Sequence, residues 1–233
     1  MINQLIKDLE NLKNDEKSKN YSRFFKTWVW EYWEWDKFYW ISVPEQRLIM
    51  KKYYNSITIN EVKKLLESEY HEQRLIWLLI LVEKYKKWTN PEKKEIFDFY
   101  LNNTFCINNW DLVDVSAHKI IWNYLIDKDR TILYKLSQSD NLWEKRISII
   151  STFAFIYNND FEDSIKICKI LINDKHDLIH KASGWVLREI WKKDEKILTK
   201  FLDENILKMP RTMLRYAIEK FDEEKRQYYL KVK

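Results

Sequence analysis

Residues 72–85 read EQRLIWLLILVEKY, and residues 143–157 read WEKRISIISTFAFIY. In each segment an arginine, Arg74 or Arg146, is followed by apolar residues at the spacing of an α-helix. The two arginines lie 72 positions apart (146 minus 74), which corresponds to two repeat units of about 36 residues. Helix pairs of that length stack into an α-solenoid, in which each pair buries its apolar face against its neighbours.

The same helical pattern extends over most of the chain. About a dozen stretches place apolar residues at positions i, i+3, i+4 and i+7. The prolines Pro44, Pro91 and Pro210 stand at apparent helix starts, where a missing N–H costs nothing. We therefore predict an all-α fold, an α-solenoid of HEAT-like helical repeats (an αα superhelix), that forms a single domain over residues 1–233. The concave surface of such a fold commonly receives an extended partner, which could be DNA, RNA or another protein.

The composition is that of a folded protein, with 45% hydrophobic and 33% charged residues. The longest apolar run, Leu75 to Val82, is about half of what a membrane crossing needs, and residues 1–13 do not form a signal core. We therefore expect a cytoplasmic protein that does not act on a membrane. The net charge of +5 permits nucleic-acid binding without establishing it. Cys106 and Cys168 stand alone, so we expect two reduced thiols and neither a metal nor a disulfide.

Glycine and tryptophan occur in abnormal numbers. The chain has 1 Gly and 12 Trp, whereas average usage of about 7% would give roughly 16 glycines. Residues 26–47, KTWVWEYWEWDKFYWISVPEQR, contain five tryptophans that neither a helix nor a strand pattern requires. Trp88 and Trp191 follow helical stretches, at positions where a helix end usually takes a glycine in the left-handed conformation.

We hypothesise that nine tryptophans are glycines encoded by UGA codons that the source organism reads as glycine: Trp28, Trp30, Trp33, Trp35, Trp40, Trp77, Trp88, Trp122 and Trp191. The alternative is a genuine aromatic patch that stacks on bases or on a partner protein. Trp110, Trp143 and Trp185 lie in motifs in which an indole has a chemical use, and we take them as genuine. With the glycines restored, residues 26–40 become a glycine-rich loop, to which we assign no site residue.

Residues 108–118, NNWDLVDVSAH, are the most informative stretch for function. If Asn109 caps a helix, Trp110, Asp114 and His118 follow at i, i+4 and i+8 and share nearly one face. An indole then lies beside a carboxylate. The alternative is a core tryptophan, with Asp114 paired to His118 or to Arg146.

Four motifs together resemble a known family. They are NNWDLVD (108–114), LWEKRISI (142–149), KASGWVLREI (181–190) and MPRTMLRYAIEKF (209–221). In order and spacing they are similar to the motifs of the HEAT-like alkylpurine DNA glycosylases, the AlkD-type DNA alkylation repair enzymes. The similarity extends from about Phe38 to Phe221. The N-terminal segment departs from the best-known members, in which helices help to recognise the lesion, so the resemblance does not fix the lesion range.

The resemblance implies a role for four residues. Asp114 would be the catalytic carboxylate, Trp110 and Trp185 would flank the lesion nucleotide, and Arg146 would contact the DNA backbone. Four further residues are candidates for DNA contacts, with a solvated helix face or an ion pair such as Arg215 with Glu219 as the alternative: Lys181, Arg188, Arg211 and Arg215. The implied protein is a monomer that acts on double-stranded DNA containing alkylated bases and uses no cofactor.

The chemistry of these residues is consistent with that activity. A purine alkylated at N3 or N7 is cationic and already a good leaving group, so the enzyme needs no strong general acid. As the N-glycosidic bond breaks, positive charge develops on the deoxyribose, and a nearby carboxylate stabilises it and can orient water. Each indole face adds about 0.5–2 kcal/mol of cation–π attraction when water is excluded. We therefore expect a monofunctional DNA glycosylase, since the motifs contain no lysine nucleophile.

Two other functions stay open: a HEAT-repeat module that binds damaged or branched DNA without cutting it, and a HEAT adaptor for a protein partner. A metal site is the weaker interpretation of His176 and His180, which are spaced i and i+4. They lack both the glutamate of an HExxH motif and a third ligand.

The codons of the gene test the glycine hypothesis. We expect TGA at all nine suspected positions and TGG at positions 110, 143 and 185. TGG at the nine positions would contradict the hypothesis and favour the aromatic patch.

Overall fold

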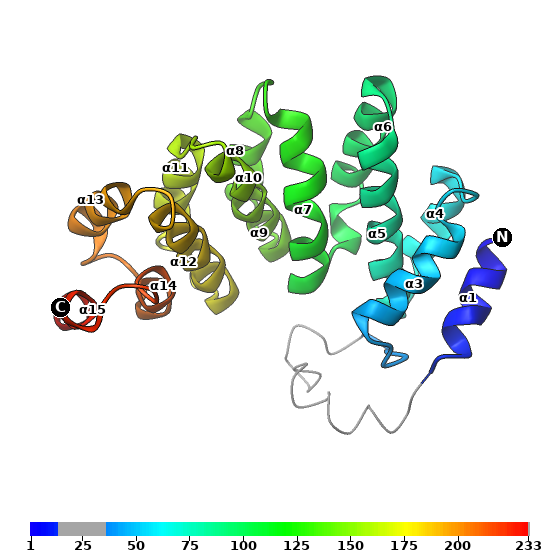
Figure 1. Cartoon of the computed structure of the whole chain (residues 1–233), viewed down its shortest axis with the longest axis horizontal. Coiled ribbons are helices and arrows are strands. Elements are labelled where there is room, and N and C mark those ends of the chain that lie inside the picture. Colours follow the sequence, from blue (N-terminus) through cyan, green and yellow to red (C-terminus); the bar gives the residue numbers. More distant parts are fainter. Residues whose placement is uncertain (14–35, 233) are drawn as a thin grey trace. The chain divides into compact units, whose positions relative to one another are not determined.

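The computed structural model describes residues 1–13 and 36–232 (Figure 1). Within these ranges the regular structure is helical, and the one β-type pairing is an isolated bridge between Lys37 and Tyr70. This confirms the predicted all-α, helical-repeat fold. The described chain forms two compact units, Met1–Ser116 and Ala117–Lys233. The single domain over residues 1–233 stays a prediction.

The helices of the first unit are α1 (Ile2–Glu10), α3 (Val43–Tyr53), α4 (Ile59–Leu66), α5 (His71–Lys87), α6 (Asn90–Leu101) and the first part of α7 (Trp110–Leu125), with a 3-10 turn at Thr104–Cys106. Those of the second unit are α8 (Thr131–Ser137), α9 (Leu142–Ser151), α10 (Phe153–Tyr157), α11 (Glu162–Leu171), α12 (Asp177–Trp191), α13 (Glu195–Asn205), α14 (Arg211–Ala217) and α15 (Glu223–Lys231).

In the first unit α5 is the central helix. It carries the long apolar run of residues 75–82, is buried on nearly all sides, and packs against α3, α4 and α6 (Figure 1). Each of these three neighbours begins with a capping box, in which a Ser or Thr before the helix and the Glu at its third position each bond to the other's backbone N–H. The pairs are Ser42/Glu45, Thr58/Glu61 and Thr89/Glu92. The expectation that prolines mark helix starts is confirmed. Pro44 and Pro91 lie in the first turns of α3 and α6, and Pro210 immediately precedes α14.

In the second unit α12 takes the central place. It contacts α9, α11, α13 and α14, and its closest neighbour is α14 (Figure 1). The single glycine, Gly184, lies at this contact. A Cβ atom there would lie 2.5 Å from the carbonyl oxygen of Met213 and 2.5 Å from the Cβ of Tyr216. Only glycine lets the two backbones come this close.

Trp40 has a backbone conformation that suits glycine. Its φ is +62°, in the left-handed region where a side chain crowds the backbone. By contrast, Trp88 has a φ of −88°, and Trp191 ends α12 with a right-handed Lys192 after it. The expectation of left-handed helix ends at Trp88 and Trp191 was therefore wrong, because neither helix ends in a glycine-type cap.

The indole N–H groups of three suspected tryptophans differ from that of Trp185. Those of Trp77, Trp122 and Trp191 are buried and have no acceptor within the described residues, which costs free energy in a packed interior. The N–H of Trp185, taken as genuine, donates to Glu189 Oε1 at 3.2 Å. The missing acceptors favour the glycine hypothesis at these three positions. Four other suspected positions, Trp28, Trp30, Trp33 and Trp35, lie outside the described residues.

Two substitutions at position 40 test the backbone argument. Trp40→Gly and Trp40→Ala both remove the indole, but only glycine adopts a positive φ without strain. We expect the Gly variant to have a free energy of unfolding about 1 kcal/mol above that of the Ala variant. Urea unfolding of both proteins measures the difference. An Ala variant at least as stable as the Gly variant would show that position 40 does not require left-handed backbone.

Candidate active site

The first turns of α7 carry two of the three residues predicted to be catalytic. The helix begins at Trp110, directly after Asn109, whose carbonyl accepts the Val113 N–H at 3.2 Å. The Asn109 side chain is buried, and its amide has no hydrogen-bond partner in the described part of the chain. The helix therefore starts where the sequence predicted, but the expected side-chain cap does not form.

Asp114 and Trp110 share the partly exposed side of this helix. Both are half-buried, whereas Leu112 and Val113 between them are completely buried. Because Asp114 follows Trp110 by four residues, one helical turn separates them, as the spacing predicted. Neither side chain is completely buried, and the catalytic role of Asp114 stays a prediction.

A buried tyrosine supports α7 near Asp114. The Tyr100 hydroxyl of α6 lies 3.0 Å from Ser116 Oγ, which in turn donates to the Leu112 carbonyl at 2.6 Å. Burial raises the pKa of Tyr100, and the negative charge of Asp114 adds to the rise. The phenol therefore stays neutral and keeps its hydrogen bond over the physiological pH range.

On the other side, a buried cluster of charges holds the first turn of α7. His71 Nε2 lies 2.8 Å from Asp111 Oδ2, and His71 Nδ1 lies 3.5 Å from Asp36 Oδ2. Arg74 Nη2 lies 2.6 Å from the same Asp36 oxygen. The side chains of His71, Asp36 and Arg74 are each less than 10% exposed. We call these four residues the charge cluster.

The charges in the cluster decide the protonation of His71. Burial lowers the pKa of the imidazole, but the charge and hydrogen bonds of Asp111 and Asp36 outweigh burial and raise it to about 9. Burial likewise raises the pKa of Asp36, yet its contacts with His71 and Arg74 bring it below the ordinary value. At neutral pH His71 is therefore an imidazolium between two carboxylates.

Glu72, next to His71, fixes the segment that leads into α3. Its carboxylate accepts the backbone N–H groups of Tyr39 at 3.0 Å, Trp40 at 2.8 Å and Ile41 at 3.3 Å. Such converging N–H groups form an anion-binding nest, which here holds an internal carboxylate. The nest and the charge cluster border a pocket of about 310 Å³ that is also lined by Phe38, Pro44 and Leu75.

The third predicted residue, Trp185, lies on α12 in the second unit. It is half-buried, and its ring centroid lies 4.5 Å from that of Phe153. The Glu189 carboxylate accepts its indole N–H. Because the preceding Gly184 packs α12 tightly on α14, the position of Trp185 is defined by contacts within its own unit.

Two of the arginines expected at DNA contact the protein's own backbone. Arg146 is 5% exposed and donates from Nη1 to the Leu178 carbonyl at 2.8 Å. Arg211 is exposed and donates from Nη2 to the Leu230 carbonyl at 2.7 Å. Arg146 in this state offers little surface to a phosphate, and its DNA contact stays a prediction.

The other basic candidates differ in their partners. Lys181 Nζ lies 2.6 Å from Asp177 Oδ2, one turn earlier in α12. Arg188 pairs with Glu219, so the alternative pair of Arg215 with Glu219 is not the one that forms. Arg215 is exposed and has no acidic partner among residues 36–232. It is the candidate most accessible to a phosphate.

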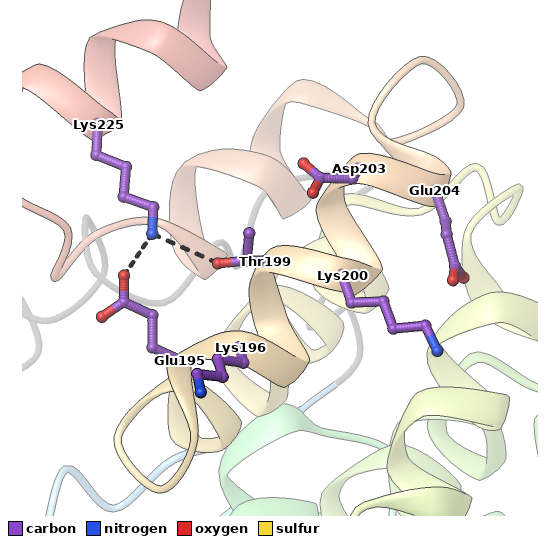
Figure 2. Close-up of a pocket in the computed structure, with 7 residues that line it drawn as sticks. All are labelled: Glu195, Lys196, Thr199, Lys200, Asp203, Glu204 and Lys225. Carbon is purple, nitrogen blue, oxygen red and sulfur yellow. Dashed lines mark hydrogen bonds and ion pairs between the residues drawn. The ribbon is translucent and has the colours of Figure 1, made fainter.

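A larger pocket is lined by none of the predicted site residues. Figure 2 shows its lining side chains on α13 and α15, with Lys225 paired to Glu195. Lys225 Nζ also lies 3.4 Å from Thr199 Oγ1. Its volume is about 680 Å³, but lysines and acidic residues alternate around it, and no predicted site residue borders it. Its charges compensate one another, so the pocket does not displace α7 as the candidate site.

Comparison with known proteins decides the family. The family model for DNA alkylation repair enzymes matches residues 5–221. The chain belongs to this family. A similar solved structure is a predicted DNA alkylation repair enzyme from Enterococcus faecalis, with a TM-score of 0.70, 15% sequence identity, and coverage of 91% of this chain and 97% of that chain. At that identity the likeness shows a shared fold. A comparison with curated proteins finds no match.

Other features of this DNA alkylation repair family member agree with local roles. His176 caps α12 by accepting the Leu178 N–H, and His180 contacts the Asp174 carbonyl at 2.6 Å. Within the described ranges no three His, Cys, Asp or Glu side chains gather as metal ligands would. None of the described helices is long and apolar enough to cross a membrane.

The charge cluster was not predicted from the sequence. Asp36 belongs to the loop to which no site residue was assigned, Arg74 was interpreted only as part of the helical repeat, and no role was predicted for His71. Asp111 was the one available signal, because it lies inside the WDLVD motif between Trp110 and Asp114. Nothing in the pattern links positions 36, 71 and 111, because these side chains meet only through tertiary packing.

The raised pKa of His71 predicts how stability depends on pH. With a pKa of 6.5 in the unfolded chain and about 9 in the folded protein, the stabilisation is complete below pH 6.5 and is lost as the pH rises through 9. The loss should be roughly 3 kcal/mol of unfolding free energy, as measured by urea unfolding at several pH values. His71→Gln should remove this slope, whereas His180→Gln should keep it. A wild-type stability that is flat from pH 6.5 to 9 would contradict a charged His71.

Proposed function

We propose that this member of the family is a monofunctional DNA glycosylase that excises cationic N3- and N7-alkylated purines from duplex DNA. The observation that carries the proposal is the common, partly exposed face of Trp110 and Asp114 on α7. A carboxylate beside an indole suits a reaction in which positive charge develops on a sugar.

The proposed reaction uses water as its second substrate. The bond between the sugar C1′ and the purine nitrogen breaks, and its electron pair neutralises the cationic base, which leaves. Asp114 stabilises the oxocarbenium-like sugar and orients a water whose oxygen bonds to C1′. That water loses one proton, so the products are the neutral alkylpurine, an abasic site and a proton. No cofactor is needed.

The roles of the remaining residues follow from the family resemblance. Trp185 is proposed to line the lesion nucleotide together with Trp110, and its indole is already held by Phe153 and Glu189. Arg215, which is exposed, is proposed to bind a phosphate first. Lys181, Arg188 and Arg211 would exchange their internal partners for DNA phosphates. Arg146 would release the Leu178 carbonyl to do so. We propose that the protein acts as a cytoplasmic monomer.

Asp114→Asn tests the mechanism. The amide keeps the shape of the side chain but removes the charge that stabilises the transition state. We expect the single-turnover rate of 7-methylguanine release from methylated duplex DNA to fall by about 100-fold or more. DNA affinity should stay the same or improve.

Asp127→Asn is the matched control, because the Asp127 side chain is 79% exposed and lies outside the proposed site. Its rate should equal that of the wild-type protein. Base release by Asp114→Asn at the wild-type rate would contradict the mechanism. DNA binding without base release by the wild-type protein would favour a non-catalytic binder. Absence of DNA binding at low salt, where phosphate contacts are strongest, would favour a protein-binding adaptor.

A further inference from the structure

The residues of the proposed reaction depend on how the start of α7 is held. Asp111 lies between Trp110 and Asp114 in the sequence, and its carboxylate contacts the imidazole of His71 on α5. Asn108, two residues before the helix, reaches the same cluster through Asp36 Oδ1 at 3.4 Å. The first turn of α7 is therefore tied to buried charge rather than to apolar contacts alone.

We propose that His71 is a positioning residue for base excision: by bridging Asp36 and Asp111 it fixes the turn of α7 that presents Trp110 and Asp114. This inference rests on the proposed function for its effect on catalysis. His71 itself does not touch the reacting atoms.

The balance of charges explains why a histidine suits this position. The two carboxylates of Asp36 and Asp111 face the imidazolium of His71 and the guanidinium of Arg74, so the cluster is neutral. An imidazolium carries an N–H on each of its two nitrogens. That of Nε2 faces Asp111 at hydrogen-bond distance, 2.8 Å, and Nδ1 faces Asp36 in an ion pair at 3.5 Å. Breaking a buried pair by removing one partner leaves an uncompensated charge.

The other cation of the cluster, Arg74, is paired with Asp36 at 2.6 Å. The Glu72 carboxylate, on the same helix, is occupied by three backbone N–H groups. The face of the imidazole is stacked on Phe38, with ring centroids 5.1 Å apart. If His71 is neutralised, Asp111 should turn toward water and displace the first turn of α7.

Three variants separate positioning from folding. His71→Gln leaves Asp111 charged without its cationic partner. Asp111→Asn leaves the imidazolium with Asp36 alone. The double variant His71→Gln/Asp111→Asn removes both charges and restores a neutral hydrogen-bonding pair of similar size.

Single-turnover release of 7-methylguanine measures the effect on catalysis. We expect His71→Gln to lower the rate on the order of 100-fold, because displacements of about 1 Å cost this much, while DNA affinity stays within about threefold. The double variant should recover most of the rate. Asp114→Asn should reduce base release whichever residue occupies position 71. A double variant as slow as His71→Gln would overturn positioning, since the imidazolium charge itself would then be what catalysis needs.

Amide hydrogen exchange measures positioning without reference to activity. In His71→Gln, exchange should accelerate at residues 110–116 and stay unchanged in α12, and the double variant should restore protection. Unchanged exchange at residues 110–116 would overturn the proposal even if activity fell. If the wild-type protein releases no base, the proposed function fails while this exchange experiment still decides the role of His71. Should His71→Gln not fold, Asp111→Asn takes its place in both measurements.

Discussion

The start of α7 is held by an ion cluster that is almost completely removed from water. An imidazolium between two carboxylates, with a guanidinium on the outer one, joins α5, α7 and the segment before α3. Removing such charges from water is costly, and the cost is offset only when their number and geometry match. The cluster therefore restricts the positions of the elements that it joins, including α7, which carries Trp110 and Asp114.

The two units order the helices that carry predicted catalytic residues by different physical means. In the first unit, buried charge and the Tyr100–Ser116 hydrogen bond support α7. In the second, the absence of a side chain at Gly184 lets α12 and α14 pack closely, and Trp185 follows directly in the chain. Hydrogen bonds and ion pairs fix the orientation of the groups that they join, whereas close packing fixes the distance between two helices. Both kinds of contact can therefore position a functional side chain.

The tryptophans differ in whether their indole N–H has an acceptor and in their backbone conformation. Trp185 has both a ring partner and an acceptor for its N–H, as a selected aromatic residue would. Trp77, Trp122 and Trp191 bury an N–H without an acceptor in the described chain, and Trp40 occupies left-handed backbone. Backbone angle and hydrogen bonding therefore give a structural reason to suspect Trp40, Trp77, Trp122 and Trp191, whereas the composition gives only the total number of tryptophans.

The sequence by itself determined the helical fold, because apolar period, proline position and capping boxes act over a few neighbouring residues. It also determined that Trp110 and Asp114 share a face, since this follows from helix geometry. Only the tertiary structure decided that Asp36 and Asp111 meet at His71, that Arg146 is buried, and that Glu219 pairs with Arg188. Burial and ion pairing depend on which helices become neighbours, and residues 40 positions apart, such as His71 and Asp111, leave no local pattern of their contact.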